Sequence, residues 1–273
     1  MNRAPADSPG RTVLVFAGAD PSGGAGIAAD ILAIAAQGAH ALPVITAITV
    51  QDNDRVYEVL PVDGEVVWRQ ALALMNKVAI HAVKIGIPGN RANADVIAQV
   101  IGRLRAADPA LPVVLDPVIA SGAGDALTRV DALLPLLRLA SVIVPNLPEA
   151  KALGEAAGAA TVAEQAASLR AHGCANVLVT GGHADGALVV NRWFGAHGET
   201  QWQWPRLPGA FHGSGCTLAS AIAARLACGD GMQQALGTAQ QYCHQALEDA
   251  FSIADGQRIP QRARSTNSLQ RTP

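Results

Sequence analysis

The stretch His212-Gly213-Ser214-Gly215-Cys216-Thr217 has residue types in an order that could bind an anion. Alanine-rich apolar residues follow it directly, so we expect the glycine loop to open into a helix. Glycines turn the backbone without a Cβ penalty, and the first amides of a helix have no partners within it. The helix dipole adds positive potential at the same place. Gly213, Ser214 and Gly215 are therefore candidates for binding a phosphate.

Cys216 falls in the first turn of this expected helix. The potential at a helix N-terminus favours the thiolate and lowers the pKa of a cysteine, which makes Cys216 a candidate base beside the anion loop. The same residues are also explained by a tight turn before an ordinary core helix. Cys216 would then be a small buried apolar residue. The loop alone leaves both interpretations open.

A second glycine-rich stretch runs from Gly18 to Gly26, between an expected strand and an expected helix. It lacks the third glycine of a dinucleotide fingerprint, and the next strand ends at Gln51 rather than at an acidic residue. A loop that contacts a substrate fits better, because ligands of open α/β sheets bind at the carboxyl ends of the strands. Asp30 follows within the helix, where a solvated carboxylate is the ordinary interpretation.

Acidic residues also follow two later strands. Asp116 ends a buried apolar run, and Glu149 comes three residues after Asn146. Carboxylates at strand ends suit Mg²⁺, which takes oxygen ligands and bridges phosphates. Asn146 and Glu149 also fit the N-cap and third position of a helix, and a capping pair needs no metal. Both interpretations stay open.

Short β-branched runs alternate with alanine-rich stretches between these motifs, a pattern typical of parallel βαβ units. We expect strands at residues 12–17, 43–50, 82–86, 112–116, 141–144 and 176–180. We expect helices at residues 24–38, 65–79, 91–106, 126–138, 147–154 and 162–172. After Gly186 the pattern predicts an antiparallel hairpin at the sheet edge. Two long helices, near 215–228 and 231–251, then close the fold.

The composition narrows the class of protein. Half of the 273 residues are apolar, 15% are charged, and the net charge is −2, which suits one domain over residues 11–260 with loose tails at 1–10 and 261–273. No apolar run is long enough to cross a membrane and no signal peptide is indicated, so we expect a cytoplasmic protein. The four cysteines lack CxxC spacing. Near-neutral charge argues against a nucleic-acid partner.

Seven motifs in chain order resemble the ribokinase-like superfamily, and more closely its hydroxymethylpyrimidine and phosphomethylpyrimidine kinases of thiamine biosynthesis. They are Ala19-Asp20-Pro21-Ser22-Gly23-Gly24-Ala25-Gly26-Ile27 with Asp30, Thr46-Ala47 with Gln51, Lys84-Ile85-Gly86, Asp116-Pro117-Val118, Pro145-Asn146-Leu147-Pro148-Glu149, Gly181-Gly182-His183 and His212 to Thr217. The resemblance implies an α/β fold, a three-layer α/β/α sandwich whose central sheet is mostly parallel, with an edge hairpin and a small strand flap. It also implies transfer of the γ-phosphoryl group of ATP to the hydroxyl of an aminopyrimidine, and then to the phosphate so formed.

The same resemblance assigns roles to individual residues. The pyrimidine would be surrounded by Gly18, Asp30, Gln51, Ile87 and Val118. Cys216 would stand where sugar kinases of the superfamily carry an aspartate base, and the loop amides would stabilise charge on the transferred phosphoryl group. ATP and Mg²⁺ would be the cofactors. The nucleotide side would hold Asn146, Thr180 and Gly182, and the metal site Asp116 and Glu149.

Other functions and another base remain open at this point. Thr180 stands where the family often has lysine and where related pyridoxal kinases use threonine, and Ile87 replaces a common methionine. A pyridoxal or related vitamin kinase is therefore the alternative, followed by a non-catalytic vitamin-binding protein. Gly122-Ala123-Gly124-Asp125 spells the glycine-aspartate signature of sugar kinases, although an amphipathic rather than a buried helix should follow it. We expect a homodimer and no membrane partner.

Overall fold

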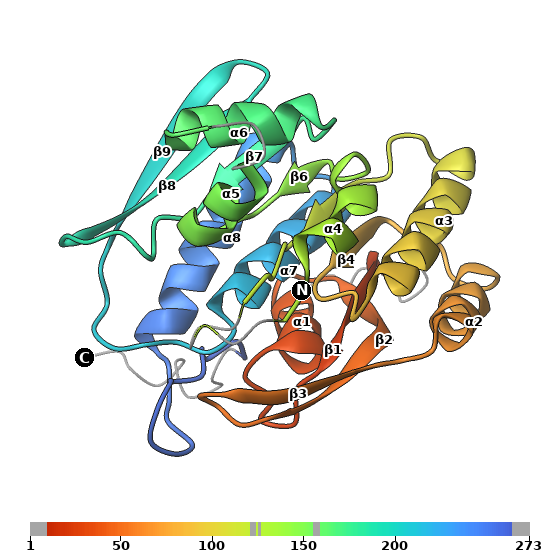
Figure 1. Ribbon diagram of the computed structural model, residues 1–273, viewed down its shortest axis with the longest axis horizontal. Coiled ribbons are helices and arrows are strands. Elements are labelled where there is room, and N and C mark those ends of the chain that lie inside the picture. Colours follow the sequence, from red (N-terminus) through yellow and green to blue (C-terminus); the bar gives the residue numbers. More distant parts are fainter. Residues whose placement is uncertain (1–9, 121–123, 125–126, 155–158, 264–273) are drawn as a thin grey trace, which may run out of the picture.

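A computed structural model describes residues 10–120, 124, 127–154 and 159–263 (Figure 1). One mixed sheet runs through it, with the strand order β3-β2-β1-β4-β5-β6-β7-β8-β9. The strands are β1 (Thr12–Ala19), β2 (His40–Gln51), β3 (Val56–Pro61), β4 (Ala82–Ile85), β5 (Val113–Leu115), β6 (Val142–Ile143), β7 (Asn176–Val179), β8 (Leu188–Gly195) and β9 (Gly198–Pro205).

The sheet is parallel in its centre and antiparallel at its edges. In sheet order, the neighbouring strands β2, β1, β4, β5, β6 and β7 pair in parallel. At one edge β3 pairs antiparallel with β2, and at the other edge the β8–β9 hairpin pairs antiparallel with β7. Each expected strand and the expected hairpin are present. Residue patterning did not predict β3, because its residues are half-buried or exposed and show no apolar alternation. With β2 it forms the small flap that the resemblance implied.

The helices cover both faces of the sheet. They are α1 (Gly26–Ala36), α2 (Gly64–Met75), α3 (Arg91–Ala107), α4 (Val130–Leu137), α5 (Leu147–Gly154), α6 (Val162–Ala171), α7 (Ser214–Ala227) and α8 (Met232–Glu248). One hydrophobic core joins the sheet to α2 through α6. A second core joins the opposite face to α1, α7 and α8. The expected three-layer sandwich is confirmed, and the expected helices are present with ends that differ by a few residues.

The central strand β1 shows how both cores form at once. Leu14 and Phe16 face the first core, whereas Val13, Val15 and Ala17 face the second. Successive side chains of a strand point to opposite faces, so a strand that is buried on both sides must be apolar throughout. This is why the strands read as continuous apolar runs and not as alternating ones.

The segment that follows α8 belongs to the fold. It returns along the domain, with bridges from Phe211 to Arg258 and from Phe251 to Ile259. Arg262 is only 2% exposed. The expectation of a loose tail from residue 261 is therefore wrong at Arg262, because this charged side chain finds polar partners inside the protein. Those partners belong to the candidate site described below.

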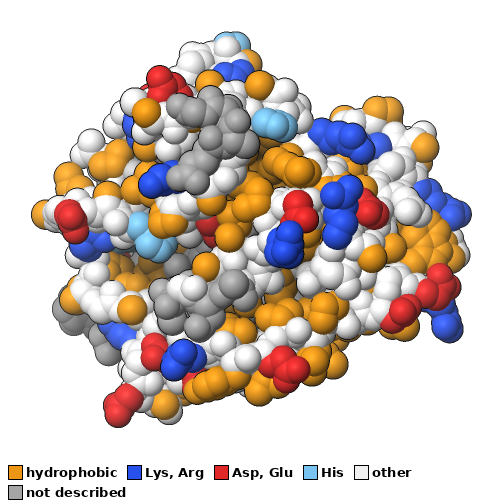
Figure 2. Space-filling model, viewed as in Figure 1, with side chains coloured by type: hydrophobic (Ala, Val, Ile, Leu, Met, Phe, Trp, Pro, Cys, Tyr) orange, Lys and Arg blue, Asp and Glu red, His pale blue; other side chains and the backbone are white. Residues whose placement is uncertain are grey.

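Within the described ranges, none of the helices combines the length and apolar character needed to cross a membrane. Figure 2 shows basic and acidic side chains interspersed over one face of the molecule. This distribution agrees with the near-neutral net charge of the sequence.

Candidate active site

A cavity of about 310 Å³ opens at the edge of the sheet where the parallel strands end. Residues at or just after the ends of β1, β2, β4, β5, β6 and β7 contribute to its lining, because parallel strands carry their carboxyl ends to the same edge. The predicted site residues that line it are Gly18, Gln51, Ile87, Asp116, Val118, Asn146, Glu149, Thr180, Gly182, Gly213, Ser214, Gly215 and Cys216. Asp30 does not line it.

The predicted anion loop leads directly into α7, as expected. Gly213 is the N-cap residue and has a left-handed backbone, with φ +78°. A Cβ atom added there would lie 2.0 Å from the carbonyl oxygen of Gly24, so two loops far apart in the sequence touch through their backbones. Gly215 has no left-handed backbone, and a Cβ atom there would lie 3.6 Å from Asp116 Oδ1. Of these two glycines, Gly213 alone requires glycine for its conformation.

Cys216 lines the cavity in the first turn of α7, but the expected fall in its pKa is wrong. Its side chain is partly exposed to the cavity, yet it lies deep in the protein. Burial raises the pKa of the Cys216 thiol to about 12, the Lys84 ammonium opposes this, and Asp116 and Asp30 raise the pKa further. Desolvation and two carboxylates outweigh the potential of the helix terminus. The thiol is therefore protonated at neutral pH.

Asp30 does not line the cavity but binds a residue that does, Lys84. Its carboxylate is fully buried and accepts hydrogen bonds from Lys84 Nζ at 2.9 and 3.0 Å and from Ser220 Oγ at 2.6 Å. Lys84 Nζ also lies 3.9 Å from Asp116 Oδ2. Burial disfavours a charged lysine, but Asp30, Cys216 and Asp116 raise the pKa of Lys84 above its ordinary value. Asp30 thus holds the Lys84 ammonium near Asp116 and close enough to Cys216 to affect the pKa of its thiol.

Asp116 and Glu149 form a buried acidic pair. Burial raises the pKa of Asp116 to about 6, while Lys84 opposes the shift. Burial and the charge of Asp116 raise the pKa of Glu149 to about 8. Asn146 Oδ1 accepts from the Glu149 N–H, and Glu149 Oε2 accepts from the Asn146 N–H, both at 2.9 Å. The capping interpretation is therefore confirmed, and the carboxylate that caps the helix also lines the cavity.

The acidic pair is suited to a divalent cation. Asp116 Oδ2 is buried and has no hydrogen-bond partner among the residues that the structure describes. Among the described residues, no three His, Cys, Asp or Glu side chains gather closely enough to hold a metal by themselves. Mg²⁺ commonly takes one or two carboxylates and completes its shell with water and phosphate oxygens. The two carboxylates therefore fit Mg²⁺ as it is bound with a nucleotide.

The raised pKa of Glu149 predicts how stability depends on pH. In the absence of Mg²⁺, between its ordinary pKa of 4.5 and about 8 the folded protein holds a proton that the unfolded chain releases. The contribution of Glu149 is therefore fully present in acid and is lost as the pH rises through 8. We expect wild type to lose roughly 2–4 kcal/mol relative to Glu149→Gln between pH 5 and 9. Urea unfolding at each pH measures this, and parallel pH curves would contradict it.

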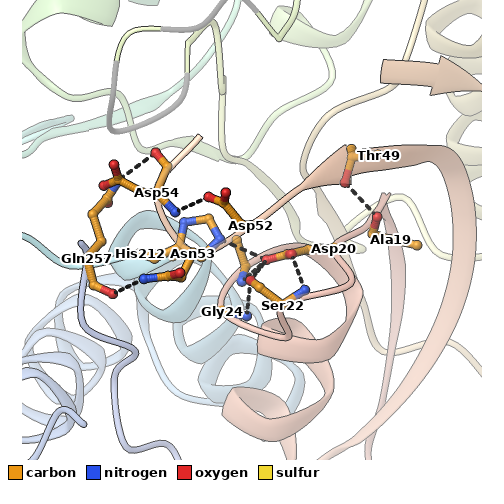
Figure 3. Close-up of polar contacts among 12 residues, drawn as sticks. Ala19, Asp20, Ser22, Gly24, Thr49, Asp52, Asn53, Asp54, His212 and Gln257 are labelled. Atoms are coloured by element: carbon orange, nitrogen blue, oxygen red, sulfur yellow. Dashed lines mark hydrogen bonds and ion pairs between the residues drawn. The ribbon is translucent and has the colours of Figure 1, made fainter. Parts of the chain in front are cut away.

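Asp20 and His212 form a pair at the cavity that residue reasoning did not assign (Figure 3). His212 Nε2 lies 2.8 Å from Asp20 Oδ2, and the same carboxylate accepts from the Ser22 hydroxyl and from the N–H groups of Ser22 and Ala25. Although burial opposes it, these contacts lower the pKa of Asp20 below its ordinary value. Asp20 follows a buried strand, the same signal that singled out Asp116, but its partner lies 192 residues away.

The flap is fastened to the segment that follows α8 (Figure 3). Asn53 Nδ2 donates to the carbonyl oxygens of Asp255 and Gln257 at 2.9 and 3.1 Å, and Gln257 Nε2 donates to the Asp54 carbonyl at 3.2 Å. Asn53 lies in the turn between β2 and β3, and Gln257 and Gln51 both line the cavity. These hydrogen bonds therefore fix the flap in place as one wall of the cavity.

Comparison with known proteins identifies the family. The phosphomethylpyrimidine kinase family model matches residues 20–261. The chain belongs to this family. It is 38% identical over 257 residues to the hydroxymethylpyrimidine/phosphomethylpyrimidine kinase of Rhizobium meliloti, covering 89% of this chain and 93% of the relative.

Solved structures of kinases share the fold of this family member. An ADP complex of Bacillus subtilis pyridoxal kinase superposes with a TM-score of 0.81 at 26% identity, over 92% of this chain and 97% of that one. The phosphomethylpyrimidine kinase of Clostridium difficile gives a TM-score of 0.73 at 30% identity, over 86% and 99%. The sandwich is therefore ribokinase-like, as the resemblance implied.

The alternative base Asp125 lies outside the described residues.

Proposed function

We propose that this kinase transfers the γ-phosphoryl group of ATP to the hydroxyl of hydroxymethylpyrimidine, and then a second one to the monophosphate. The observation that carries the proposal is a single cavity that joins the anion loop and Cys216 to Gln51 and to the acidic pair. A base, an anion site and a cation site on one cavity are the parts that phosphoryl transfer needs. The cofactors of this reaction are ATP and Mg²⁺. The enzyme acts in the cytoplasm, where ATP is plentiful.

In the first step, Cys216 would act as the thiolate, after its own proton has passed to solvent. The thiolate accepts the proton of the substrate hydroxyl as the hydroxyl oxygen attacks the γ-phosphorus, the bond from that phosphorus to the bridging oxygen breaks, and ADP leaves. The free amides of Gly213, Ser214 and Gly215 at the start of α7 stabilise the negative charge on the transferring group. Lys84 lies beneath Cys216 and favours the thiolate. Asp116 and Glu149 would hold Mg²⁺, which supplies positive charge to the phosphates and offsets the carboxylate that raises the pKa of Cys216.

Three residues shape the proposed pyrimidine end of the cavity. Gln51 ends β2 and offers an amide donor and an amide acceptor to a ring that presents both. Gly18 lies at a register shift between β1 and β2. A Cβ atom on Gly18 would lie 2.6 Å from Ile87 Cδ1, so Ile87 occupies the space that the glycine leaves. A flat ring bound against this contact would leave no room for a larger residue at Gly18 or Ile87.

The decisive experiment incubates the protein with ATP and Mg²⁺ and, separately, hydroxymethylpyrimidine, its monophosphate and pyridoxal. Mass spectrometry should show the pyrimidine monophosphate and then the diphosphate. Preferred phosphorylation of pyridoxal would favour the vitamin B6 kinase, which Thr180 and the high structural similarity to pyridoxal kinase also support. ATP binding without a phosphorylated product from any of the three would contradict the enzyme and favour a vitamin-binding protein.

Gln51→Leu tests the pyrimidine assignment. Leucine keeps much of the bulk but removes both polar atoms, which leaves ring nitrogens without partners in the cavity. We expect kcat/KM for hydroxymethylpyrimidine to fall by about 10–100-fold and its advantage over pyridoxal to narrow. Steady-state kinetics with both substrates measures this. Equal losses on the two substrates would show that Gln51 only shapes the cavity.

We also propose that two copies pair through the outer face of the flap. Ile48 and Leu60 are directly opposite each other on β2 and β3 and are 54% and 44% exposed, and Val50 is 46% exposed. Such an apolar ribbon at a sheet edge is suited to a second copy. Light scattering after gel filtration should give twice the chain mass of 28.0 kDa. A monomer at micromolar concentration would contradict this proposal.

A further inference from the structure

Arg262 reaches the site from the end of the segment that follows α8, and sequence reasoning placed it in the tail that begins at residue 261. Its guanidinium donates to the carbonyl oxygen of Gly24, to that of Gly213 at 3.3 Å and to Thr217 Oγ1 at 2.9 Å. Tyr242 on α8 donates its hydroxyl to the Arg262 carbonyl at 3.0 Å and so fixes the backbone at this point. The side chain is thus held at both ends.

These contacts join the two glycine loops that border the cavity. Gly24 belongs to the loop between β1 and α1, and Gly213 is the N-cap of α7. Thr217 Oγ1 itself donates to the Gly213 carbonyl at 2.7 Å, so the hydroxyl links Arg262 to the first turn of α7. One guanidinium therefore sets the distance between the loops and the direction of the Gly213 peptide, although Arg262 does not line the cavity.

The charge of Arg262 is buried among neutral acceptors. Within the described part of the chain, its hydrogen bonds go to two carbonyl oxygens and one hydroxyl. Burial lowers the pKa of Arg262, and Cys216 is the largest of the neighbours that oppose this shift. A buried guanidinium without a bonded carboxylate is costly, and bonds to carbonyls alone need no such charge. An anion that arrives in the adjacent cavity would interact favourably with it.

We propose that Arg262 is a positioning residue for phosphoryl transfer, which clamps the anion loop to the β1–α1 loop and adds positive charge beside the phosphates. This inference rests on the proposed function of the same cavity. Hydrogen-bonded charges that are lost from a buried site weaken binding or catalysis by about 10–100-fold. The effect belongs mainly to kcat and to polyphosphate affinity, because Arg262 contacts Gly24, Gly213 and Thr217 and none of the residues proposed for the pyrimidine.

Arg262→Met, which keeps the length of the side chain but removes its charge, tests this inference. We expect kcat to fall by about 10–100-fold while KM for the pyrimidine stays within about threefold, and pyrophosphate affinity, measured by calorimetry, to fall about tenfold. Arg262→Lys should recover part of kcat because it restores the charge. Free guanidinium ion should partly rescue Arg262→Ala.

Arg105→Met is the matched control. Arg105 also binds a carbonyl and a hydroxyl, of Leu111 and Ser141, but at the amino ends of β5 and β6, whereas the cavity lies at the carboxyl ends. Its kcat should remain at the wild-type value. Equal losses in both variants, or wild-type kcat and pyrophosphate affinity in Arg262→Met, would overturn the proposal. If Arg262→Met does not fold, Tyr242→Phe, which loosens the same clamp, should lower kcat about two- to fivefold without rescue by guanidinium; an unchanged kcat there would also overturn it.

Wild-type protein separates this inference from the proposed function. No phosphorylated product with any substrate would contradict the proposed function alone. The pyrophosphate arm would then still decide whether Arg262 supports an anion site.

Discussion

Replacing Cys216 with alanine is expected to lower kcat for hydroxymethylpyrimidine by about 10²–10⁴-fold, the usual loss when a general base is removed. KM should change little, because the thiol acts on the hydroxyl proton and not on the ring. The second step should lose less, since a phosphate monoester is already ionised near neutral pH and offers an oxygen that needs no base. Separate assays that start from the alcohol and from its monophosphate measure the two losses.

Cys228→Ala is the matched control for this variant. Cys228 is the C-cap of α7, at the other end of the same helix, so its loss should leave both steps at wild-type rates. Equal losses in the two phosphorylation steps would indicate that Cys216 shapes the site and is not a base. Wild-type kcat in Cys216→Ala together with no activity in Asp125→Ala would place the base in the other glycine loop.

Gly213→Ala is expected to damage both stability and activity. A methyl group there would meet the Gly24 carbonyl at 2.0 Å and the Arg262 guanidinium at 2.8 Å, on a backbone that L-residues rarely adopt. We expect a loss of about 2–4 kcal/mol in the free energy of unfolding. Displacing the anion loop by even 1 Å should lower kcat by about 10²-fold or more. Urea unfolding and steady-state kinetics on the same preparation measure both effects.

Gly215→Ala separates conformation from the space that the phosphate needs. Its Cβ atom would be in ordinary contact with Asp116, so stability should stay within about 0.5 kcal/mol of wild type. Its methyl group would still point toward the carboxylate and the transferring group, and kcat should fall. A stable Gly213→Ala variant with normal kcat would show that the loop is only a turn.

Local patterning was sufficient for the layers of this fold. The apolar runs of β1, β4 and β5 and the alanine-rich α7 carry their burial in their own composition. The edge strand β3 was missed because its exposed ribbon has no apolar alternation to detect. Glycine and strand-end motifs likewise placed Gly18, Asp116 and Gly213 at one cavity, because parallel strands bring their ends together.

The rest of the site depends on contacts that no local pattern encodes. Asp30 looked like a solvated helical carboxylate, but Lys84 from another strand and Ser220 from another helix bury it. Cys216 was expected to be acidic from the helix terminus alone, whereas burial depth decides its pKa. Arg262 looked like part of a polar tail because its acceptors lie 238 and 49 residues away.

These long separations in sequence bear on the order in which the sheet and the active site form during folding. Asp20 meets His212 across 192 residues, Asn53 meets Gln257 across 204, and Arg262 meets Gly24 across 238. Helices and neighbouring strands need only short loops to close, whereas these contacts must wait until the first and last parts of the chain meet. A refolding chain would regain helical circular dichroism before it regains turnover. Partly folded chains would carry most of the sheet and no working catalyst.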